Sequence, residues 1–273
     1  MPKTILLTGA TDGIGLETAK MLAPLGHHLL LHGRNTAKLE QAKAQVAALP
    51  GAGPVETYAA DLSDMKQVEA LAAEVSSKHD KLDVLINNAG VFMTPNTVTP
   101  DGLDIRFAVN TVAPYLLATR LTPLMGPGGR VVNLSSAAQA KVDLQALAGQ
   151  NSRPLPDNTA YAQSKLAITM WTNHLAALYQ DDGPLFVSVN PGSLLGSKMV
   201  REAYGMAGGD LKIGADILTR AAVSEEFAHA NGKYFDNDSG RFAPPHRDAT
   251  NPKLCASVVD TMQSWLAAHQ TGA

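Results

Sequence analysis

The first 25 residues follow an order that few folds accommodate: a short strand, a turn with three glycines, and a helix. The strand run is Lys3–Thr8, the glycines of 9–15 follow with the spacing G-x-x-x-G-x-G, and an Ala- and Leu-rich helix reaches about Leu25. Glycines let a phosphate approach the backbone, and the first turn of a helix offers unpaired N–H groups at the positive end of its dipole. This order predicts a dinucleotide-binding turn; a plain tight connection is the alternative. The candidate binding residues here are Gly9, Thr11, Asp12, Gly13, Ile14 and Gly15.

The rest of the chain continues to alternate strands with helices. Six more strands are expected, at His28–His32, Val55–Ala60, Leu82–Ile86, Gly129–Ser136, Leu185–Val189 and Lys233–Phe235. Helices are expected at 36–49, Asp64–Lys78, Gly102–Met125, Thr159–Leu178, Gly214–Ala228 and Pro252–Ala268. Such alternation predicts an α/β fold with a doubly wound parallel sheet of about seven strands, which binds ligands at the carboxyl ends of its strands. No linker or internal repeat divides the 273 residues, so we expect a single domain over 1–273.

Composition excludes several classes of function. The net charge of −3 provides no electrostatic footprint for nucleic acid or an anionic membrane. The single cysteine, Cys255, excludes an intramolecular disulfide and a zinc cluster of several thiols. The eight histidines are scattered; His27 and His28 begin a strand, where we expect them to cap or to be solvated, and we predict no metal site. The chain enters a strand at Lys3 without an apolar leader, and no run reaches about 18 apolar residues, so we expect a cytoplasmic protein without a membrane partner.

The end of the second strand indicates which dinucleotide is bound. NAD-binding proteins place an acidic residue there to accept the ribose 2′-hydroxyl. This chain has no acidic residue between Glu17 and Glu40, and Arg34 stands where a 2′-phosphate needs a cation, followed by Asn35. We therefore expect NADP(H), with NAD(H) possible; the alternative for Arg34 is a solvated loop residue.

Polar residues also follow the third, fourth and sixth strands. Asp61 and Leu62 follow the third, where Asp61 either meets the adenine or forms an Asx turn before the next helix. An asparagine pair and small residues follow the fourth strand and suit a backbone that passes beneath a cofactor, with turn chemistry as the alternative. The remaining candidates for cofactor binding are Asn88, Ala89, Gly90, Pro191, Gly192 and Ser193.

A tyrosine and a lysine lie four residues apart in the longest apolar helix. Residues four apart share one face of a helix, so Lys165 projects beside Tyr161. A phenol is a poor acid or base near neutrality, and a nearby ammonium favours the phenolate. This pair therefore predicts acid–base chemistry. Because Y-x-x-x-K is common by chance, a pair on a solvated helix face is the alternative.

Three further features lie near this pair in the expected fold. Ser135 and Ser136 end the fifth strand, where a hydroxyl either caps the next segment or donates to a developing oxyanion. Asn110 interrupts an apolar helix shortly before Pro114, which predicts a local kink; its buried amide needs partners, and the backbone alone is one way to provide them. The polar segment 137–158 predicts an excursion over the active-site edge.

The glycine-rich segment at about 193–212 is expected to be an irregular substrate lid. Its apolar residues favour a hydrophobic or aromatic substrate, with plain packing as the alternative. These residues are Leu194, Leu195, Met199 and Met206.

These motifs together resemble the short-chain dehydrogenase/reductase family over essentially the whole chain. They are Thr8-Gly9-x-x-x-Gly13-x-Gly15, Asn87-Asn88-Ala89-Gly90, Asn110, Ser136, Tyr161-x-x-x-Lys165 and Pro191-Gly192. The resemblance implies a Rossmann fold and hydride transfer between a substrate carbon and nicotinamide C4. It implies that Tyr161 exchanges the proton with the substrate oxygen and that Ser136 holds this oxygen. It further implies that Lys165 assists the tyrosine and binds the nicotinamide ribose, and that Asn110 supports a water in the proton path.

Two departures refine the resemblance. Ser136 lies 25 residues before Tyr161, about twice the gap of many members, and this spacing resembles the retinol-dehydrogenase-like and WW-domain-oxidoreductase-like branch. That branch often carries a membrane-anchoring segment, which we do not find here, so retinoid or sterol chemistry is not expected on this basis. The family pattern P-G-x-x-x-T would place a threonine at 196, where this chain has Gly196 followed by Ser197.

The sequence thus predicts an NADP(H)-dependent oxidoreductase that interconverts a small-molecule carbonyl and its alcohol. A non-catalytic NADP(H)-binding regulatory protein on the same fold is the main alternative. An epimerase or dehydratase that uses the cofactor transiently is a third reading. By family resemblance we expect a homodimer or homotetramer formed through the helices at Thr111–Leu124 and Tyr161–Leu178.

Overall fold

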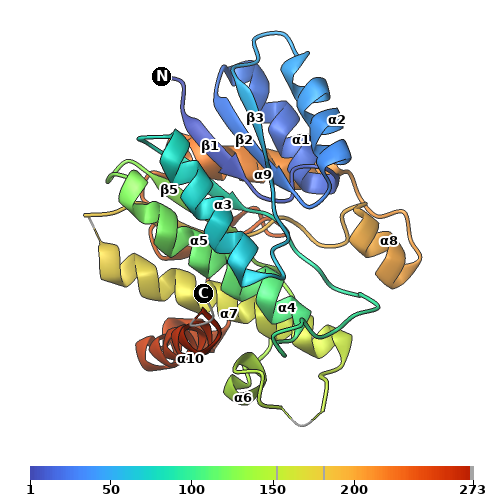
Figure 1. Cartoon of the computed structure of the whole chain (residues 1–273), viewed down its shortest axis with the longest axis vertical. Helices are drawn as coiled ribbons and strands as arrows, with labels where there is room; N and C mark the ends of the chain where they lie inside the picture. The colour runs from blue at the N-terminus through green and yellow to red at the C-terminus, as the bar shows by residue number, and fades with distance from the viewer. Residues whose placement is uncertain (152, 181, 271–273) are drawn as a thin grey trace.

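One eight-stranded sheet runs through the centre of the computed structural model, which describes residues 1–151, 153–180 and 182–270 (Figure 1). The strand order is β3-β2-β1-β4-β5-β6-β7-β8. The strands are β1 Thr4–Leu7, β2 His28–Gly33, β3 Val55–Ala59, β4 Val84–Asn87, β5 Arg130–Leu134, β6 Leu185–Asn190, β7 Lys233–Asp236 and β8 Arg241–Ala243. The first seven strands pair in parallel, which confirms the predicted sheet. β8, which the sequence did not predict, pairs antiparallel with β7 across a short turn.

Helices cover both faces of the sheet. They are α1 Gly13–Leu22, α2 Thr36–Ala47, α3 Met65–Lys78, α4 Ile105–Phe107, α5 Ala113–Leu121, α6 Leu144–Leu147, α7 Asp157–Tyr179, α8 Lys198–Tyr204, α9 Leu211–Val223 and α10 Pro252–Gln270. Side chains of a strand alternate between the two faces. Ile5 and Leu7 therefore join the apolar core under α1, α2 and α9, while Leu6 joins the core under α3, α5 and α7. The doubly wound arrangement follows from strands that are apolar on both faces.

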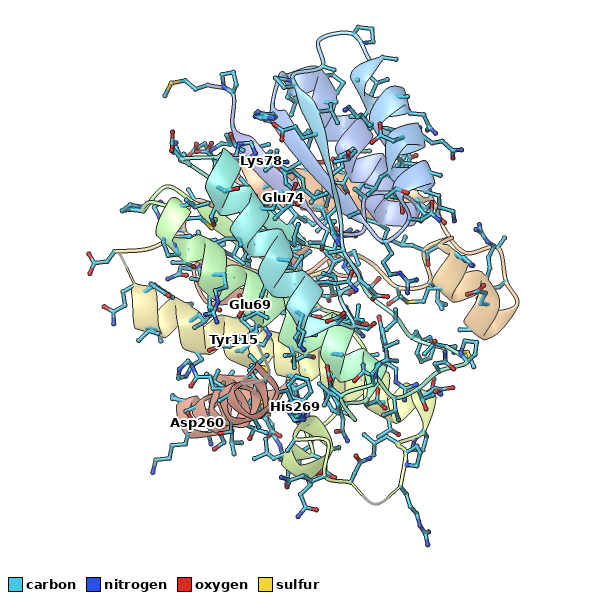
Figure 2. All side chains as sticks on the ribbon, in the orientation of Figure 1. Glu69, Glu74, Lys78, Tyr115, Asp260 and His269 are labelled. Carbon is cyan, nitrogen blue, oxygen red and sulfur yellow. The ribbon has the colours of Figure 1, made fainter. Side chains whose placement is uncertain are left out.

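The C-terminal helix α10 packs against α7 and is part of the core on that side of the sheet. Trp171 of α7 is completely buried, and Val258 and Met262 of α10 belong to the same apolar cluster. Gln263 of α10 also donates to the Tyr115 hydroxyl of α5 at 2.8 Å. Figure 2 labels Tyr115, together with Asp260 and His269 of α10. The apolar surplus of α7 is thus buried by the sheet on one side and by the chain's own last helix on the other. The homodimer or homotetramer expected through the helices at Thr111–Leu124 and Tyr161–Leu178 stays a prediction.

Two segments expected to be irregular contain short helices. The excursion 137–158 includes α6, whose Ala146 and Leu147 are completely buried in the core and which packs on α10. The segment expected to be a lid includes α8, which Ser197 caps by accepting a hydrogen bond from the Val200 N–H at 3.3 Å. In both cases the helix depends on contacts with distant parts of the chain or on a capping side chain, rather than on an apolar period.

Candidate active site

The glycine turn joins β1 to α1 in a conformation that specifically requires glycine. Gly9 and Gly13 have φ values of 66° and 57°, in the left-handed region that glycine enters without strain. A methyl group on Gly15 would lie 2.1 Å from the Gly9 carbonyl oxygen, so no larger residue fits there. Asp12 caps α1 by accepting from the Gly13 N–H at 2.7 Å. The turn therefore presents the first N–H groups of a ten-residue helix beside a backbone without side chains.

A buried histidine, which the sequence analysis did not identify, supports this turn from below. His32 of β2 accepts from the Gly9 N–H through Nδ1 at 3.4 Å, and its Nε2 lies 3.0 Å from the Ala60 carbonyl oxygen. The first bond requires an unprotonated Nδ1, and the second requires a proton on Nε2. Together they define the neutral Nε2–H form of the imidazole. Burial lowers the pKa of His32 from 6.5 to about 4, against the opposing hydrogen bond to Ala60. His32 thus joins the carboxyl ends of three strands as a neutral group.

The Asn88 side chain fixes the other side of the turn. Its Nδ2 donates to the carbonyl oxygens of Thr8 at 2.9 Å and Gly9 at 3.1 Å. In return, the Thr8 hydroxyl accepts from the N–H groups of Asn88 at 3.0 Å and Ala89 at 3.1 Å. The two loops after β1 and β4 therefore form one unit, in which the Asn88 amide orients the backbone of the glycine turn.

Arg34 and Asn35 follow β2 at the same edge of the sheet. Arg34 is exposed beside the turn, as a ligand-binding cation needs to be. Asn35 caps α2, where its Oδ1 accepts from the Lys38 N–H at 2.9 Å. Because Gly33 has no side chain, the Thr11 methyl group packs closely against it. A methyl group added to Gly33 would lie only 2.6 Å from that of Thr11. The end of β2 is thereby packed directly against the glycine turn, with the guanidinium at its rim.

Asp61 and Leu62 lie after β3 at the next position along the edge. The Asp61 carboxylate accepts from the Ser63 N–H at 2.9 Å and from the Ser63 hydroxyl at 2.7 Å. This is the Asx turn that the sequence left open as an alternative, and it precedes α3, which Asp64 caps. Leu62 is buried in the core.

Tyr161 and Lys165 lie one turn apart in α7, as their spacing predicts. The Lys165 Nζ is 5.7 Å from the centre of the Tyr161 ring and donates to the carbonyl oxygen of Leu134, the last residue of β5, at 2.8 Å. Burial lowers the pKa of Lys165 to about 8, so the ammonium remains the main form at neutral pH. Phe92 packs on the tyrosine with ring centres 4.8 Å apart.

Asn110 lies in a π-helical turn, Ala108–Val112, so the kink expected at this asparagine is present as a local bulge. Its Oδ1 accepts from the Val91 N–H at 2.8 Å, while its Nδ2 lies 2.9 Å from the Val91 carbonyl oxygen and 3.0 Å from the Ser164 hydroxyl. Ser164 in turn donates to the Tyr161 carbonyl oxygen at 2.7 Å. Asn110 therefore ties the loop after β4 to the tyrosine helix. π-Bulges of this kind are frequent at functional sites.

Gly90 marks the point at which these groups converge. A methyl group on this glycine would lie 3.4 Å from Asn110 Oδ1, 3.6 Å from Lys165 Nζ and 4.0 Å from the terminal carbon of Met199. The asparagine, the lysine and α8 of the lid segment thus surround one small volume at the carboxyl end of β4.

The two serines after β5 face different surroundings. Ser135 is buried, and its hydroxyl bonds to Thr169 Oγ1 at 2.7 Å and to the Lys165 carbonyl oxygen at 3.0 Å, which commits it to α7. Ser136 is half-buried, and its hydroxyl accepts from the Ala138 N–H at 3.1 Å. The Tyr234 hydroxyl donates to the Ser136 carbonyl oxygen at 3.0 Å and fixes this backbone. The geometry therefore favours Ser136 over Ser135 as the hydroxyl available to a substrate.

A buried ion pair holds the π-helical turn and the tyrosine helix in place. Arg106, with its side chain fully buried, bonds to Asp104 through Nε at 2.8 Å and Nη2 at 2.6 Å, and it also pairs with Asp157, the first residue of α7. The Arg106 guanidinium therefore connects the helical turn before Asn110 to the start of α7, which carries Tyr161. The sequence analysis missed Arg106 because an arginine in a helix is ordinarily a surface residue.

The segment after β6 is anchored before it reaches the lid. Gly192 has a φ of 119°, and the Ser193 N–H and hydroxyl donate to Asp238 at 2.8 and 2.6 Å. Asn190 donates to Asp238 as well, at 2.9 Å. Further along, Ser197 approaches the glycine turn, 3.9 Å from a methyl placed on Gly13. Ser197 follows Gly196, which stands where the family pattern has its threonine. The Ser197 hydroxyl caps α8 by accepting from the Val200 N–H.

Comparison with known proteins identifies the family. Residues 3–207 match the family described as short chain dehydrogenase. The chain belongs to the short-chain dehydrogenase family. Within this family it is 32% identical over 252 residues to retinol dehydrogenase 13 of Homo sapiens, covering 86% of this chain and 76% of the relative. This supports the predicted retinol-dehydrogenase-like branch.

Two solved structures illustrate the similarity of the fold to known proteins. A putative uncharacterized protein from Mycobacterium paratuberculosis superposes with a TM-score of 0.80 at 27% identity, over 97% of this chain and 93% of that one. The landomycin C-6 ketoreductase LanV, solved with bound NADP and rabelomycin, superposes with a TM-score of 0.67 at 27% identity, over 87% and 95% of the two chains. Within the described residues, none of the helices combines the length and apolar character needed to span a bilayer.

Proposed function

We propose that this short-chain dehydrogenase is an NADP(H)-dependent oxidoreductase that interconverts a small-molecule carbonyl and its alcohol. The observation that carries the proposal is the convergence at Gly90 of Asn110, Lys165 and the lid segment, directly beside the glycine turn. Proton-transfer groups and a phosphate-binding turn at one edge of a parallel sheet are the arrangement that hydride transfer from a dinucleotide requires. The bound nicotinamide supplies or accepts the hydride.

Tyr161 is the group that we assign to proton exchange with the substrate oxygen. Lys165, whose ammonium donates to the Leu134 carbonyl, favours the phenolate, and we assign it the binding of the cofactor ribose as well. The Ser136 hydroxyl donates to the substrate oxygen and so stabilises the charge that develops there. Asn110 holds the Val91 backbone in position, which supports a path for the proton away from the site.

The residues at the edge of the sheet fit a dinucleotide. The missing side chains at Gly9 and Gly13, together with the N-terminus of α1, form a cradle for the phosphates. Arg34 is exposed at the end of β2 and fits a 2′-phosphate, which is why we favour NADP(H) over NAD(H). The NADP bound to the related ketoreductase LanV supports this choice. The Asp61 carboxylate is bonded to Ser63 in its turn, and we retain Asp61 as a candidate contact to the adenine.

The lid and the substrate follow from the segment after β6. We propose that the segment 193–212 covers the substrate, because α8 lies over Gly90 and the loop before it approaches Gly13. Leu194, Met206 and Ile213 are exposed apolar residues in and next to this segment. An apolar lid favours a hydrophobic substrate.

The proposal is tested by cofactor binding and turnover together. NADPH and NADH are titrated by fluorescence, and NADPH consumption is then followed by absorbance with a panel of aldehydes, ketones and quinones. We expect NADPH to bind more tightly than NADH and at least one hydrophobic carbonyl to be reduced. Arg34→Ala should remove the preference for NADPH without changing the affinity for NADH. Tight NADPH binding without turnover in either direction would support a regulatory protein instead, and equal affinity for both cofactors would contradict the role of Arg34.

A further inference from the structure

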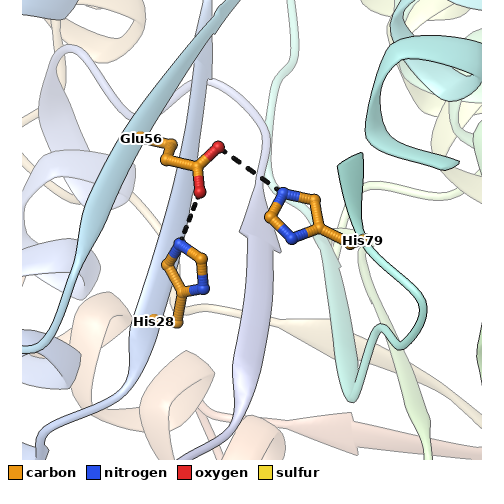
Figure 3. A group of neighbouring side chains, drawn as sticks. All are labelled: His28, Glu56 and His79. Atoms are coloured by element: carbon orange, nitrogen blue, oxygen red, sulfur yellow. Dashed lines mark hydrogen bonds and ion pairs between the residues drawn. The ribbon is translucent and has the colours of Figure 1, made fainter. Parts of the chain in front are cut away.

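Three metal-ligating side chains meet at the end of the sheet opposite the candidate active site. They are His28 at the start of β2, Glu56 in β3 and His79 at the end of α3. His28 Nε2 lies 2.8 Å from one carboxylate oxygen of Glu56, and His79 Nε2 lies 3.5 Å from the other. Figure 3 shows the two imidazoles on either side of the carboxylate. The sequence analysis expected His28 to cap or to be solvated; it missed this cluster because the partners come from segments 28 and 51 residues away.

The distances suit a tetrahedral metal site. No two of the three ligand atoms are more than 4.8 Å apart. Bonds of about 2.0–2.1 Å from zinc to nitrogen and oxygen place neighbouring ligand atoms roughly 3.4 Å apart. The observed separations lie on both sides of this value, so small side-chain rotations bring all three atoms into range. Two imidazoles and one carboxylate are the ligands that borderline metals such as zinc prefer, whereas Mg²⁺ and Ca²⁺ prefer oxygen alone.

The surroundings orient the carboxylate and leave one side open. Tyr58, two residues along the same face of β3, donates to Glu56 Oε2 at 2.9 Å and also lies 2.9 Å from His79 Nε2. The Tyr58 hydroxyl therefore fixes the orientation of the Glu56 carboxylate, as outer partners of metal ligands do. The Lys78 ammonium, 5.1 Å from the centre of the Tyr58 ring, pairs with Glu74 at 2.6 Å. Side-chain exposures of 25% for His28, 37% for Glu56 and 11% for His79 leave a path for an ion and a water.

We propose that His28, Glu56 and His79 bind one Zn²⁺ ion, with a water molecule as the fourth ligand. In the absence of metal, His28 Nε2 bonds to the Glu56 carboxylate and His79 Nε2 bonds to the Tyr58 hydroxyl. To bind the ion, each neutral imidazole carries its proton on Nδ1 and offers the lone pair of a bare Nε2, so neither ring loses its proton. The ion joins β2, β3 and the end of α3, so it stabilises the folded chain, in which alone the three ligands meet. This site is independent of the proposed oxidoreductase function.

The test measures zinc binding to the untagged full-length chain after treatment with a chelator. ZnCl₂ should bind with a stoichiometry of one ion per chain and, at about 100-fold excess over Kd, raise the melting temperature by roughly 5 °C or more. Co²⁺ should give the intense visible absorption of a tetrahedral site. His28→Gln and His79→Gln should each weaken binding at least about 100-fold, since each removes a direct ligand and loss of mere orienting partners already costs 10–100-fold. The matched control is His229→Gln, an exposed histidine far along the chain, which should bind zinc as the wild type does.

Glu56→Gln provides a second variant that keeps an oxygen acceptor for the imidazole protons. It should fold with an unchanged NADPH affinity and lose the tetrahedral Co²⁺ absorption. The proposal is overturned if ZnCl₂ leaves the wild-type melting temperature unchanged, or if the two histidine variants respond to zinc as the wild type does. Loss of binding in His229→Gln alone would place the ion elsewhere and would equally overturn it.

Discussion

Strand β2 carries a histidine at each end, and the two are used in opposite ways. His28 and His32 are four residues apart on the same face of the strand; in register with β3, His32 lies opposite Tyr58, and Leu30, between the two histidines, lies opposite Glu56. His32 is buried, neutral and bonded to backbone groups on both ring nitrogens, whereas His28 is a quarter exposed and bonded to a carboxylate. Identical side chains thus serve a rigid cofactor edge at one end of the sheet and a half-open polar cluster at the other. Burial and partners, rather than residue type, decide the role.

The difference predicts that the carboxyl edge tolerates no added volume. Gly15→Ala should cost about 3 kcal/mol of stability, the upper end for overpacking, because the new methyl meets backbone at 2.1 Å. We also expect NADPH affinity to fall by about 100-fold, since the whole turn must move. Gly126→Ala is the matched control, because a methyl there meets nothing within 4 Å. Urea unfolding measures the loss of stability, and NADPH fluorescence measures the loss of affinity. If Gly15→Ala matched Gly126→Ala in both, the close packing of Gly15 against the Gly9 carbonyl would be contradicted.

The buried state of His32 predicts a pH dependence of stability. The unfolded chain protonates this histidine near its ordinary pKa of 6.5 and the folded chain only near 4, so the unfolded chain binds more protons in between. The stabilisation is complete above about pH 6.5 and is lost as the pH falls toward 4, by about 3 kcal/mol in total. Urea unfolding of the wild type and of His32→Leu at several pH values isolates this contribution. If the two proteins show the same slope between pH 6.5 and 4, His32 is not the group responsible.

At pH 7.5 the same variant tests the support of the glycine turn. His32→Leu leaves the Gly9 N–H and the Ala60 carbonyl without their partner and should cost about 1–3 kcal/mol of stability. NADPH affinity should fall as well, because Gly9 belongs to the cradle. Chemical denaturation and fluorescence titration give the two numbers. Unchanged NADPH affinity in a destabilised His32→Leu protein would restrict His32 to a purely structural role.

The smallest effect is expected at the amino end of the strand. In the presence of a chelator, His28→Gln should change stability by less than about 1 kcal/mol, because a partly exposed ion pair contributes little. NADPH affinity and turnover should remain at the wild-type level. A change in NADPH affinity in this variant would show that the two ends of β2 are coupled and would remove the contrast between them.

Much of this molecule was predictable from local sequence. Strands that are apolar on both faces and helices between them define the parallel sheet, and the spacing of Tyr161 and Lys165 places them together on α7. The features that were missed depend on distant partners. β8 exists only as a hairpin partner of β7, α6 is held by α10, and Arg106 is buried because Asp104 and Asp157 neutralise it. The His28 cluster is of the same kind, since it needs three segments to meet.

Two of the alternatives that the sequence left open at the candidate site are distinguished by contacts in the structure. Ser135 and Ser136 are neighbours with the same hydroxyl, and only the packing of α7 against β5 shows that Ser135 is committed to the core. For Asp61, the Asx turn depends on Ser63, which is local and was therefore foreseeable as one of two readings. Roles that depend on a ligand, such as those of Tyr161 and Arg34, stay predictions.

The proposed function depends most on Tyr161, the group that we assign to proton transfer at this edge of the sheet. The most direct measurement compares the wild type with Tyr161→Phe, using NADPH and the best carbonyl from the substrate panel. We expect kcat to fall by at least about 100-fold, the usual contribution of a positioned acid or base, while the affinity for NADPH stays within about twofold and the fold is retained by circular dichroism. A Tyr161→Phe protein that reduces the same carbonyl at the wild-type rate would contradict the account.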